Sequence, residues 1–202
     1  MEISTTKVLD AYRIEPKRID DHRGSFYEAW RQEALAEALG RPFEVRQGNF
    51  AVSRRDTLRG FHFTVSPPGQ AKLVTCVRGA LTTAVVDLRV GSPTFGEFEM
   101  VDQDEDSAVG VFAAEGLGVA FIARTDGARM AYLCSTEFVA QTMLGVRALD
   151  PDLGIPWGCT EPLMSEKDAG APTVAECVAA GVLPRYETCQ ALYAGLQRGE
   201  RP

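Results

Sequence analysis

Short apolar runs separated by turn residues fill the middle of the chain, roughly residues 43–147. Turn signals recur about every 8–12 positions, which is typical of an all-β sandwich or barrel. The Val- and Thr-rich runs at 73–77 and 80–88 suit a pleated, half-buried surface. The dipeptides Arg78-Gly79 and Asp126-Gly127 predict hairpin turns. Further strands are expected at residues 58–63, 97–101, 108–112, 119–124 and 129–135.

Helix signals lie toward the two ends of the chain. Residues 31–39 are rich in Ala, Glu and Leu, and Gly40 follows as a stop signal. Thr173 begins a second helix with Glu176 at the capping-box spacing, and a third helix is expected at 186–197. A parallel α/β fold would need helices between successive strands, and the middle of the chain has none.

The expected domain organisation follows from these patterns and from the length. A chain of 202 residues can bury a sizeable core without disulfides or metals. We expect one all-β domain over residues 1–202, with its β core at about 43–147. Short helices lie at its periphery, including a C-terminal helical extension at about 173–202.

Composition excludes several classes of protein. The charge balance of 21 basic against 28 acidic residues, a net charge of −7, disfavours a nucleic-acid-binding protein. A local cluster of Arg and Lys could still bind an anionic ligand. The first residues lack a signal-peptide pattern, and no run approaches about 18 apolar residues, so we expect no membrane span. The five cysteines form no C-x-x-C pair, which favours reduced thiols in a cytoplasmic protein.

Metal and nucleotide motifs are missing as well. His22 and His62 are the only histidines, so we expect no catalytic metal. The pair Gly116 and Gly118 lacks the third glycine of a dinucleotide loop and leads into a strand. No P-loop and no G-x-S-x-G elbow occurs anywhere in the chain.

One stretch is dense in reactive side chains. It comprises residues 58–63, Leu-Arg-Gly-Phe-His-Phe, and then Gln-Ala-Lys-Leu at 70–73. In a regular strand, alternation would place Arg59 on one face and His62 on the other. Taken alone, His62 is more often a half-buried structural histidine, and Arg59 is more often a surface charge.

Ordered motifs give this stretch a context. The chain resembles the dTDP-4-dehydrorhamnose 3,5-epimerase family of cupin-fold sugar-nucleotide epimerases from about residue 20 to about residue 172. The resemblance implies a cupin-like jelly-roll homodimer that uses no metal or cofactor and acts on a dTDP-linked 4-keto-6-deoxy sugar. The motifs are D-x-R-G-x-F-x-E at 21–28, L-R-G-x-H-F at 58–63, Q-A-K-L at 70–73, V-D-L-R-x-G-S-P-T-F-G at 86–96 and D-P-x-L-G-I-x-W at 150–157.

The resemblance also implies catalytic roles. A hydrogen on a carbon next to the C4 ketone is acidic because its removal gives an enolate. His62 would be the base that removes it, with Asp168 as the carboxylate that pairs with the imidazole. Tyr132 would return a proton to the opposite face, and Lys72 would stabilise the negative oxygen at C4.

Basic substrate contacts transfer from the same resemblance. Arg23 and Arg59 match positions that contact the nucleotide-sugar, and a guanidinium fork suits diphosphate oxygens. Lys167 matches a basic position beside the substrate. As isolated residues, Arg23 and Lys167 could be surface charges.

Uncharged and acidic contacts complete the expected site. Glu28, Gln47 and Asn49 match polar positions that hold nucleotide or sugar. Phe138 matches an aromatic residue that stacks on thymine, and Phe26 is expected to line the same pocket. The competing interpretations are a solvated strand residue for Glu28 and a core aromatic for Phe138.

Two positions depart from the family pattern. Val119 stands where most members carry a second active-site histidine, and Met143 stands where the family usually has a substrate-contacting Glu. We therefore expect an epimerase that inverts only C3, in the biosynthesis of an unusual deoxysugar. The alternatives are inversion of both C3 and C5, inversion of C5 alone, a 3,4-ketoisomerase, and a protein that only binds its nucleotide-sugar.

Overall fold

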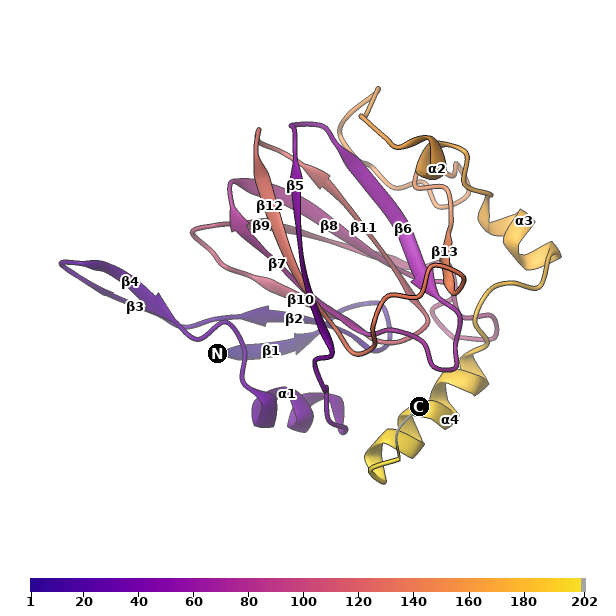
Figure 1. Cartoon of the computed structure of the whole chain (residues 1–202), viewed down its shortest axis with the longest axis horizontal. Coiled ribbons are helices and arrows are strands. Elements are labelled where there is room, and N and C mark those ends of the chain that lie inside the picture. Colours follow the sequence, from indigo (N-terminus) through magenta and orange to yellow (C-terminus); the bar gives the residue numbers. More distant parts are fainter. Residues whose placement is uncertain (201–202) are drawn as a thin grey trace.

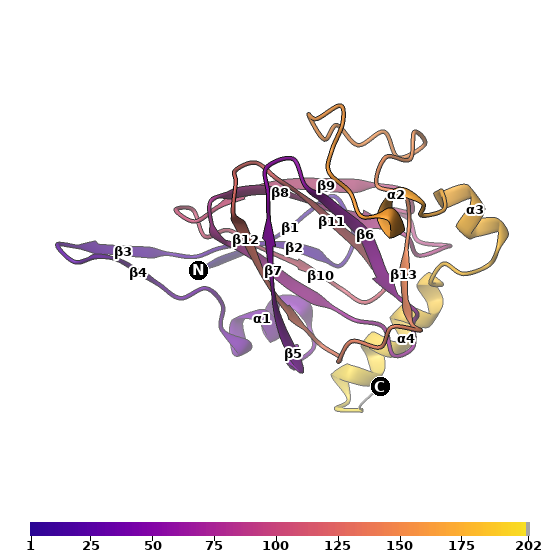
Figure 2. The same cartoon turned by 45° about the horizontal axis from the view of Figure 1, so that its top comes forward.

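Two antiparallel β-sheets pack face to face in the computed structural model, which describes residues 1–200 (Figures 1 and 2). The expected all-β architecture is confirmed. The six-stranded sheet has the order β1 (Glu2–Thr5), β2 (Ala11–Glu15), β10 (Gly110–Ala113), β7 (Lys72–Arg78), β12 (Ala128–Cys134) and β5 (Gln47–Ser53). The five-stranded sheet has the order β13 (Met143–Gly145), β6 (Leu58–Thr64), β11 (Leu117–Ala123), β8 (Ala80–Asp87) and β9 (Phe98–Asp104).

Helices occupy the periphery, as the sequence predicts. They are α1 (Gln32–Leu39), α2 (Glu166–Ala169), α3 (Val174–Ala179) and α4 (Tyr186–Gln197). Gly40 ends α1 in the left-handed conformation, and Thr173 and Glu176 form the expected capping box at α3. Within residues 1–200, no helix is long and apolar enough to cross a membrane. Residues 201–202 of the expected C-terminal extension lie outside the described residues.

The N-terminal segment contains strands that its pattern did not predict. β1 and β2 extend the six-stranded sheet beyond β10. A separate hairpin of β3 (Arg18–Asp21) and β4 (Gly24–Tyr27) projects away from the body of the molecule (Figure 1). Its side chains are mostly exposed, with Ile19 at 61% and Phe26 at 70%. The hairpin therefore lacks a core of its own.

Both predicted hairpin turns are wrong. At Arg78-Gly79 the chain passes from β7 in one sheet to β8 in the other, and at Asp126-Gly127 it passes from β11 to β12 in the reverse direction. β8 is buried on both faces between β9 and β11, so it cannot form an arm of a half-exposed hairpin. Turn residues specify a change of direction, but burial decides which strands pair.

Two apolar clusters hold the layers together. One lies between the sheets and contains side chains such as Val74, Val85 and Phe121. The other lies on the outer face of the five-stranded sheet, where residues 146–183 cover it. In that cluster Trp157 packs against Phe61, with ring centroids 6.0 Å apart, and donates its indole N–H to a backbone carbonyl. The segment that carries α2 is thereby fixed to β6.

Arg89 is the largest fully buried charged side chain of the described chain. Its guanidinium is paired with Asp87 at 2.8 Å and with Asp10 at 2.5 Å, and it also donates to the Leu9 carbonyl. The adjacent residue Val90 exchanges backbone hydrogen bonds with the segment that leads into α4. This network joins the end of β8 to the loop between β1 and β2 and to the C-terminal helix.

A β-bulge in β6 changes which side chains share a face. His62 pairs with Val119 of β11, but Arg59 pairs with Phe121, so two residues of β6 stand opposite Ala120 alone. Regular alternation would separate Arg59 from His62. The bulge turns both side chains toward the space between the sheets, which corrects the prediction that they lie on opposite faces.

Gly60 makes the bulge possible. Its φ of +102° lies in a region that L side chains rarely adopt, and a Cβ there would lie 2.6 Å from the Val119 carbonyl oxygen. Gly91 also has a positive φ, +88°, but a Cβ there would meet nothing within 4 Å. An alanine at Gly91 would therefore suffer conformational strain alone, whereas an alanine at Gly60 would suffer both strain and steric overlap.

We expect Gly60→Ala to lower the melting temperature at least about twice as far as Gly91→Ala. Both variants acquire the strain of a left-handed alanine, about 1–2 kcal/mol, and only Gly60→Ala adds overlap with β11 backbone. Thermal unfolding followed by circular dichroism measures the difference. An equal drop in melting temperature in the two variants would show that the bulge tolerates a side chain at residue 60.

Candidate active site

A cavity of about 660 Å³ lies between the two sheets. Alternate positions of the strands supply its walls, because side chains two residues apart share a strand face. Its polar or aromatic lining includes every predicted catalytic residue and the predicted substrate contacts Gln47, Asn49, Arg59, Phe138 and Lys167.

His62 and Asp168 form a hydrogen-bonded pair, with His62 Nε2 and Asp168 Oδ1 2.7 Å apart. Burial raises the pKa of Asp168, but the hydrogen bond and the charge of His62 outweigh it, and the net pKa is below the usual value. The Ser165 hydroxyl caps α2 by accepting from the Asp168 backbone N–H at 3.1 Å. The short helix thus fixes the carboxylate behind the imidazole.

Tyr132 lines the cavity from the opposite sheet. It belongs to β12 of the six-stranded sheet, whereas His62 belongs to β6 of the five-stranded sheet. Burial raises the pKa of Tyr132, and the neighbouring Cys134 raises it further, while Arg59 lowers it. The phenol therefore keeps its proton at neutral pH, and a molecule between the sheets would have a base on one side and an acid on the other.

Lys72 carries a buried ammonium group. The residue is 7% exposed, and its Nζ has no hydrogen-bond partner among the described protein groups. Burial lowers the pKa of Lys72, against the opposing effects of Cys134 and Glu115. Because an unpaired buried charge is costly, the group is suited to a negative charge that develops inside the cavity.

Arg59 is positioned by the edge strand of the other sheet. Its guanidinium donates to the Ser53 hydroxyl at 3.2 Å and to the Val52 carbonyl at 3.3 Å. The residue remains exposed, and Lys167 lines the same cavity from α2. These two cations give the cavity an anion-binding region in a protein whose net charge is negative.

Gln47 links the predicted aromatic contact to β5. Its side-chain oxygen accepts from the Phe138 backbone N–H at 2.7 Å, and its amide donates to Asn49 at 2.8 Å. The Phe138 ring is 55% exposed at the cavity, so it is not the core aromatic of the competing interpretation. An exposed ring on a fixed loop can stack on a planar ligand.

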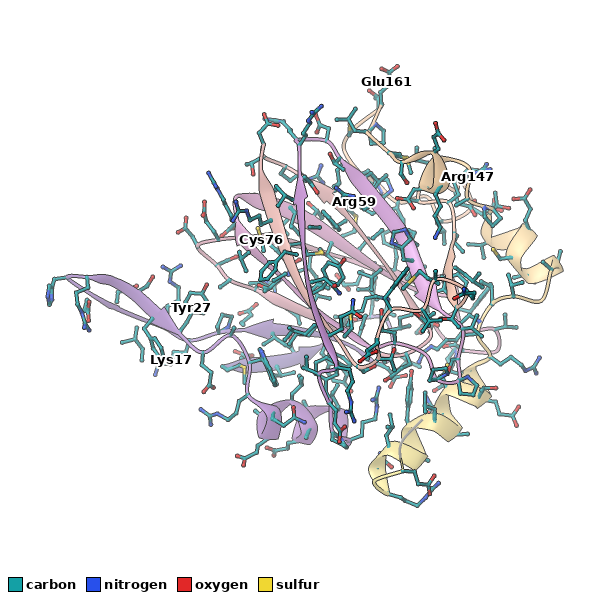
Figure 3. The ribbon with its side chains drawn as sticks, viewed as in Figure 1. Lys17, Tyr27, Arg59, Cys76, Arg147 and Glu161 are labelled. Carbon is teal, nitrogen blue, oxygen red and sulfur yellow. The ribbon has the colours of Figure 1, made fainter. Side chains whose placement is uncertain are left out.

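Arg23, Phe26 and Glu28 do not line the cavity of their own chain. Arg23 and Phe26 lie on the projecting hairpin, where Arg23 pairs with Asp21. Glu28 pairs instead with an exposed arginine that precedes α1. Figure 3 shows Tyr27 on the hairpin, well apart from Arg59 on β6.

The two departures from the family pattern both line the cavity. Val119 is the β11 residue directly paired with His62, and Met143 is paired with Thr64 on the other side of β6. Both side chains are apolar, so the cavity wall beside His62 is apolar at these two positions. The predictions also missed apolar lining residues, which alternation within the strands could have identified: Val74, Phe121 and Met130.

Residues 1–200 contain no group of three or more His, Cys, Asp or Glu side chains placed to hold a metal ion. His22 lies at the tip of the projecting hairpin, between β3 and β4, and His62 lies in the cavity. The groups that remain at the cavity are a paired imidazole, a phenol and an ammonium. Together they can move protons and stabilise an oxyanion.

We expect Lys72→Met to raise the melting temperature at pH 7. The folded-state pKa of Lys72 is lowered, so its charged form opposes folding below that pKa, and this cost falls as pH rises toward 10.5. The advantage of the variant should therefore shrink at pH 10. A gain of about 1 kcal/mol would raise the melting temperature by about 2–4 °C.

The exposed Lys17 supplies the control for that measurement. Lys17→Met removes the same charge from the hairpin surface, so its melting temperature should stay close to that of the unmodified protein at both pH values. A lower melting temperature for Lys72→Met than for Lys17→Met at pH 7 would contradict a destabilising ammonium.

Known proteins with similar sequences are sugar-nucleotide epimerases. A dTDP-4-dehydro-6-deoxyglucose 3-epimerase from a Streptomyces species is 46% identical over 181 residues, covering 89% of this chain and 92% of its own length. A dTDP-4-dehydrorhamnose 3,5-epimerase from Mycolicibacterium smegmatis is 44% identical and covers 95% of this chain and 94% of its own.

Solved structures agree with the sequences. The rmlC epimerase of Mycobacterium tuberculosis superposes with a TM-score of 0.94 at 37% identity, covering 97% of this chain and all of that one. ChmJ, a 3'-monoepimerase from Streptomyces bikiniensis solved with dTDP-quinovose, gives a TM-score of 0.92 at 44% identity and covers 96% and 98%. The model of the dTDP-4-dehydrorhamnose 3,5-epimerase family matches residues 5–176. With its motifs, jelly-roll sandwich and cavity in agreement, the chain belongs to the dTDP-4-dehydrorhamnose 3,5-epimerase family.

Proposed function

We propose that the protein is a cofactor-independent epimerase that inverts C3 of a dTDP-linked 4-keto-6-deoxy hexose, in the biosynthesis of an unusual deoxysugar. The observation that carries this proposal is the placement of a His62–Asp168 pair and a protonated Tyr132 on opposite sheets of one cavity. Inversion of a carbon needs removal of a proton from one face and its return to the other, which this arrangement permits.

Deprotonation is the task of His62. Asp168 accepts a hydrogen bond from Nε2, so Nδ1 is the nitrogen with a free lone pair. Nδ1 takes the C3 proton, the C3–H electron pair forms a C3–C4 double bond, and the C4 carbonyl electrons move to oxygen. The carboxylate of Asp168 stabilises the imidazolium that results.

Lys72 stabilises the enolate. Its ammonium has no competing hydrogen bond within the described protein, so it can donate to the C4 oxygen as negative charge develops there. The substrate's own ketone thus receives the electrons. As the C4 carbonyl re-forms, the electrons of the C3–C4 double bond take the Tyr132 proton at C3 from the opposite sheet. Exchange with solvent then returns a proton to the tyrosinate and removes one from the His62 imidazolium.

The nucleotide end of the substrate matches the remaining cavity residues. Arg59 and Lys167 suit the diphosphate, and Phe138 offers an exposed ring for the thymine base. Gln47 and Asn49 supply polar contacts along β5. Relatives solved with dTDP or dTDP-sugars support a substrate of this class.

The restriction to C3 rests on the apolar wall beside His62. Val119 can neither donate a hydrogen bond nor transfer a proton, and Met143 lacks the carboxylate that the family usually offers. Sequence identity does not decide the matter, because relatives named as 3-epimerases are 44–47% identical to this chain and relatives named as 3,5-epimerases are 38–45% identical, so the two ranges overlap. Inversion of both carbons is therefore the main competing outcome.

Proton NMR of dTDP-4-keto-6-deoxyglucose in D₂O tests the proposal. We expect the C3 proton signal to disappear on addition of enzyme while the C5 proton signal persists. Loss of both signals would identify an enzyme that inverts C3 and C5, and loss of the C5 signal alone would identify a C5-epimerase. Persistence of both signals would contradict an epimerase acting on this sugar.

Two variants assign the roles within that experiment. His62→Ala should lower the exchange rate by at least about 100-fold, the usual contribution of a general base. Tyr132→Phe should retain exchange but lose most of the inversion, since the phenol acts only after deprotonation. Equal losses of exchange and inversion in Tyr132→Phe would contradict a role as proton donor alone.

We also propose a cytoplasmic homodimer in which each hairpin completes the partner's cavity. The unpaired cysteines support a reducing compartment. The hairpin exposes Ile19 and Phe26, and the edge strand β5 exposes Phe50 and Val52 beside the cavity, which supports a second copy of the chain as the covering partner. The resemblance assigns substrate contacts to Arg23 and Phe26, which do not line the cavity of their own chain, and a partner's hairpin would supply them.

Mixed dimers test this arrangement. We expect His62→Ala and Arg23→Ala to be poorly active alone, and an equal mixture after subunit exchange to regain about a quarter of the wild-type sites. Random pairing makes half of the dimers hybrid, and each hybrid has one cavity with both residues intact. A mixture that stays as inactive as its components would place Arg23 in its own chain's site or outside any site.

A further inference from the structure

The C-terminal helix is connected to the catalytic lysine by an unbroken series of contacts. In Figure 1, α4 lies at the end of the sandwich opposite the β5–β6 and β11–β12 connections. Its Tyr193 is 6% exposed, and the hydroxyl donates to the Glu115 carbonyl oxygen and accepts from Arg89 at 3.3 Å. The Arg41 guanidinium lies over the same ring, 4.3 Å from its centroid.

Glu115 continues the series toward the cavity. Its buried carboxylate pairs with Arg41 at 2.6 Å and accepts from the Ser135 hydroxyl at 3.2 Å. That hydroxyl accepts from the Ala71 N–H at 2.8 Å, and the Ser135 N–H donates to the Ala71 carbonyl at 3.0 Å. Ala71 immediately precedes Lys72 in the chain.

The contacts of Ser135 clamp the two strands at the catalytic lysine. Ser135 follows Cys134, and Cys134 is the direct partner of Lys72 where β7 and β12 pair. The Glu115 carboxylate therefore holds the strand ends from which the ammonium projects. A shift of that clamp would move Nζ relative to the cavity.

The clamp also supplies charge. Burial opposes the charged form of Lys72, whereas Cys134 and Glu115 favour it. Other titratable or charged groups that line the cavity wall around Lys72 are Tyr132 on β12, Arg59 and His62 on β6, and Lys167 and Asp168 on α2. Arg41 offsets part of the Glu115 charge from the far side.

We propose that α4 is a positioning element of the active site, acting through Tyr193 and Glu115 on Lys72. This inference rests on the proposed role of Lys72 in stabilising the enolate. Neither Tyr193 nor Glu115 lines the cavity, so both act through other groups. The C-terminal extension thus has a function in the reaction in addition to covering the end of the sandwich.

Tyr193→Phe tests the proposal, with Tyr186→Phe as its matched control. Both substitutions remove one phenolic hydroxyl from α4, and Tyr186 keeps its ring against Arg89, 5.1 Å from the ring centroid. The Tyr186 hydroxyl makes no hydrogen bond within residues 1–200, whereas that of Tyr193 is the link to Glu115. The control thus accounts for the loss of a phenolic hydroxyl from α4, whereas Tyr193→Phe in addition removes the hydrogen bond to Glu115 and the one accepted from Arg89.

We expect Tyr193→Phe to lower kcat for exchange of the substrate proton about three- to tenfold, with KM within about twofold of wild type. Loss of one hydrogen bond is of that order, and Lys72 acts on the transition state rather than on substrate binding. Tyr186→Phe should leave both constants unchanged. Equal kcat values for Tyr193→Phe and wild type would overturn the proposal, as would an equal loss in both variants.

A second readout does not depend on activity. The chain has only four lysines, so the ε-methylene signal of Lys72 can be followed by NMR in ¹³C-lysine protein and assigned by its loss in Lys72→Met. We expect this signal to move in Tyr193→Phe and to stay in place in Tyr186→Phe. In Glu115→Gln, its titration midpoint should fall because the supporting negative charge is gone.

The two readouts keep the hypotheses separate. If wild-type enzyme exchanges neither proton of any 4-keto sugar, the proposed function fails, and the Lys72 signal still decides whether α4 acts on the lysine. If Glu115→Gln does not fold because Arg41 is left unpaired, Tyr193→Phe still gives the result. An unmoved Lys72 signal in Tyr193→Phe would overturn the inference.

Discussion

Complete burial of the Arg89 guanidinium is the constraint on which much of this architecture depends. A buried cation must be surrounded by acceptors, and here these come from the end of β8, the loop after β1 and the C-terminal helix. Segments from both halves of the chain must therefore be in place together. Asp87, with hydrogen bonds from Ser92 and Thr94 as well, has a pKa below its usual value despite its burial.

Lys72, the residue proposed to stabilise the enolate, presents the opposite situation. Arg89 is surrounded by partners, whereas the Lys72 ammonium is buried with none among the described protein groups. An unpaired buried ammonium lowers the stability of the fold, and this cost fits the proposal that its strongest interaction is made in the reaction. A fully paired cation and an unpaired one thus occupy the same sandwich, and the contacts from Arg89 through Tyr193 and Glu115 to Ser135 lead from one toward the other.

Sequence patterns predicted the strands between residues 58 and 135, the helices near the two ends and the capping box, because each depends on local periodicity or local hydrogen bonds. They missed the four N-terminal strands. They failed at the two crossovers between sheets, since a turn dipeptide does not specify a pairing partner. They also failed at the bulge, where Gly60 lets Arg59 and His62 share a face. Of the four proposed catalytic residues, His62 and Lys72 lie within the family motifs, and Tyr132 and Asp168 lie outside them. No motif specifies the geometry, because Asp168 meets His62 from a helix 106 positions away.

The groups that support Lys72 from outside the cavity could not be predicted either, because long-range contacts bring them together. Glu115 and Arg41 have no motif, and only the fold brings them behind Lys72. Arg23 and Phe26 lie within a motif, but the motif does not specify whether they would contact substrate in the cavity of their own chain or in that of a second copy. Long-range contacts and assembly both lie beyond what a single sequence pattern contains.

The exposed edge of β5 has a consequence for the newly made chain, before the proposed homodimer forms. Phe50 is 72% exposed and Val52 58% exposed on a strand whose outer backbone groups have no neighbouring strand. Such an edge favours intermolecular strand pairing and aggregation unless it is covered. In the proposed homodimer, covering this edge would protect the newly made chain and enclose the substrate at once, so solubility and turnover would depend on the same few side chains.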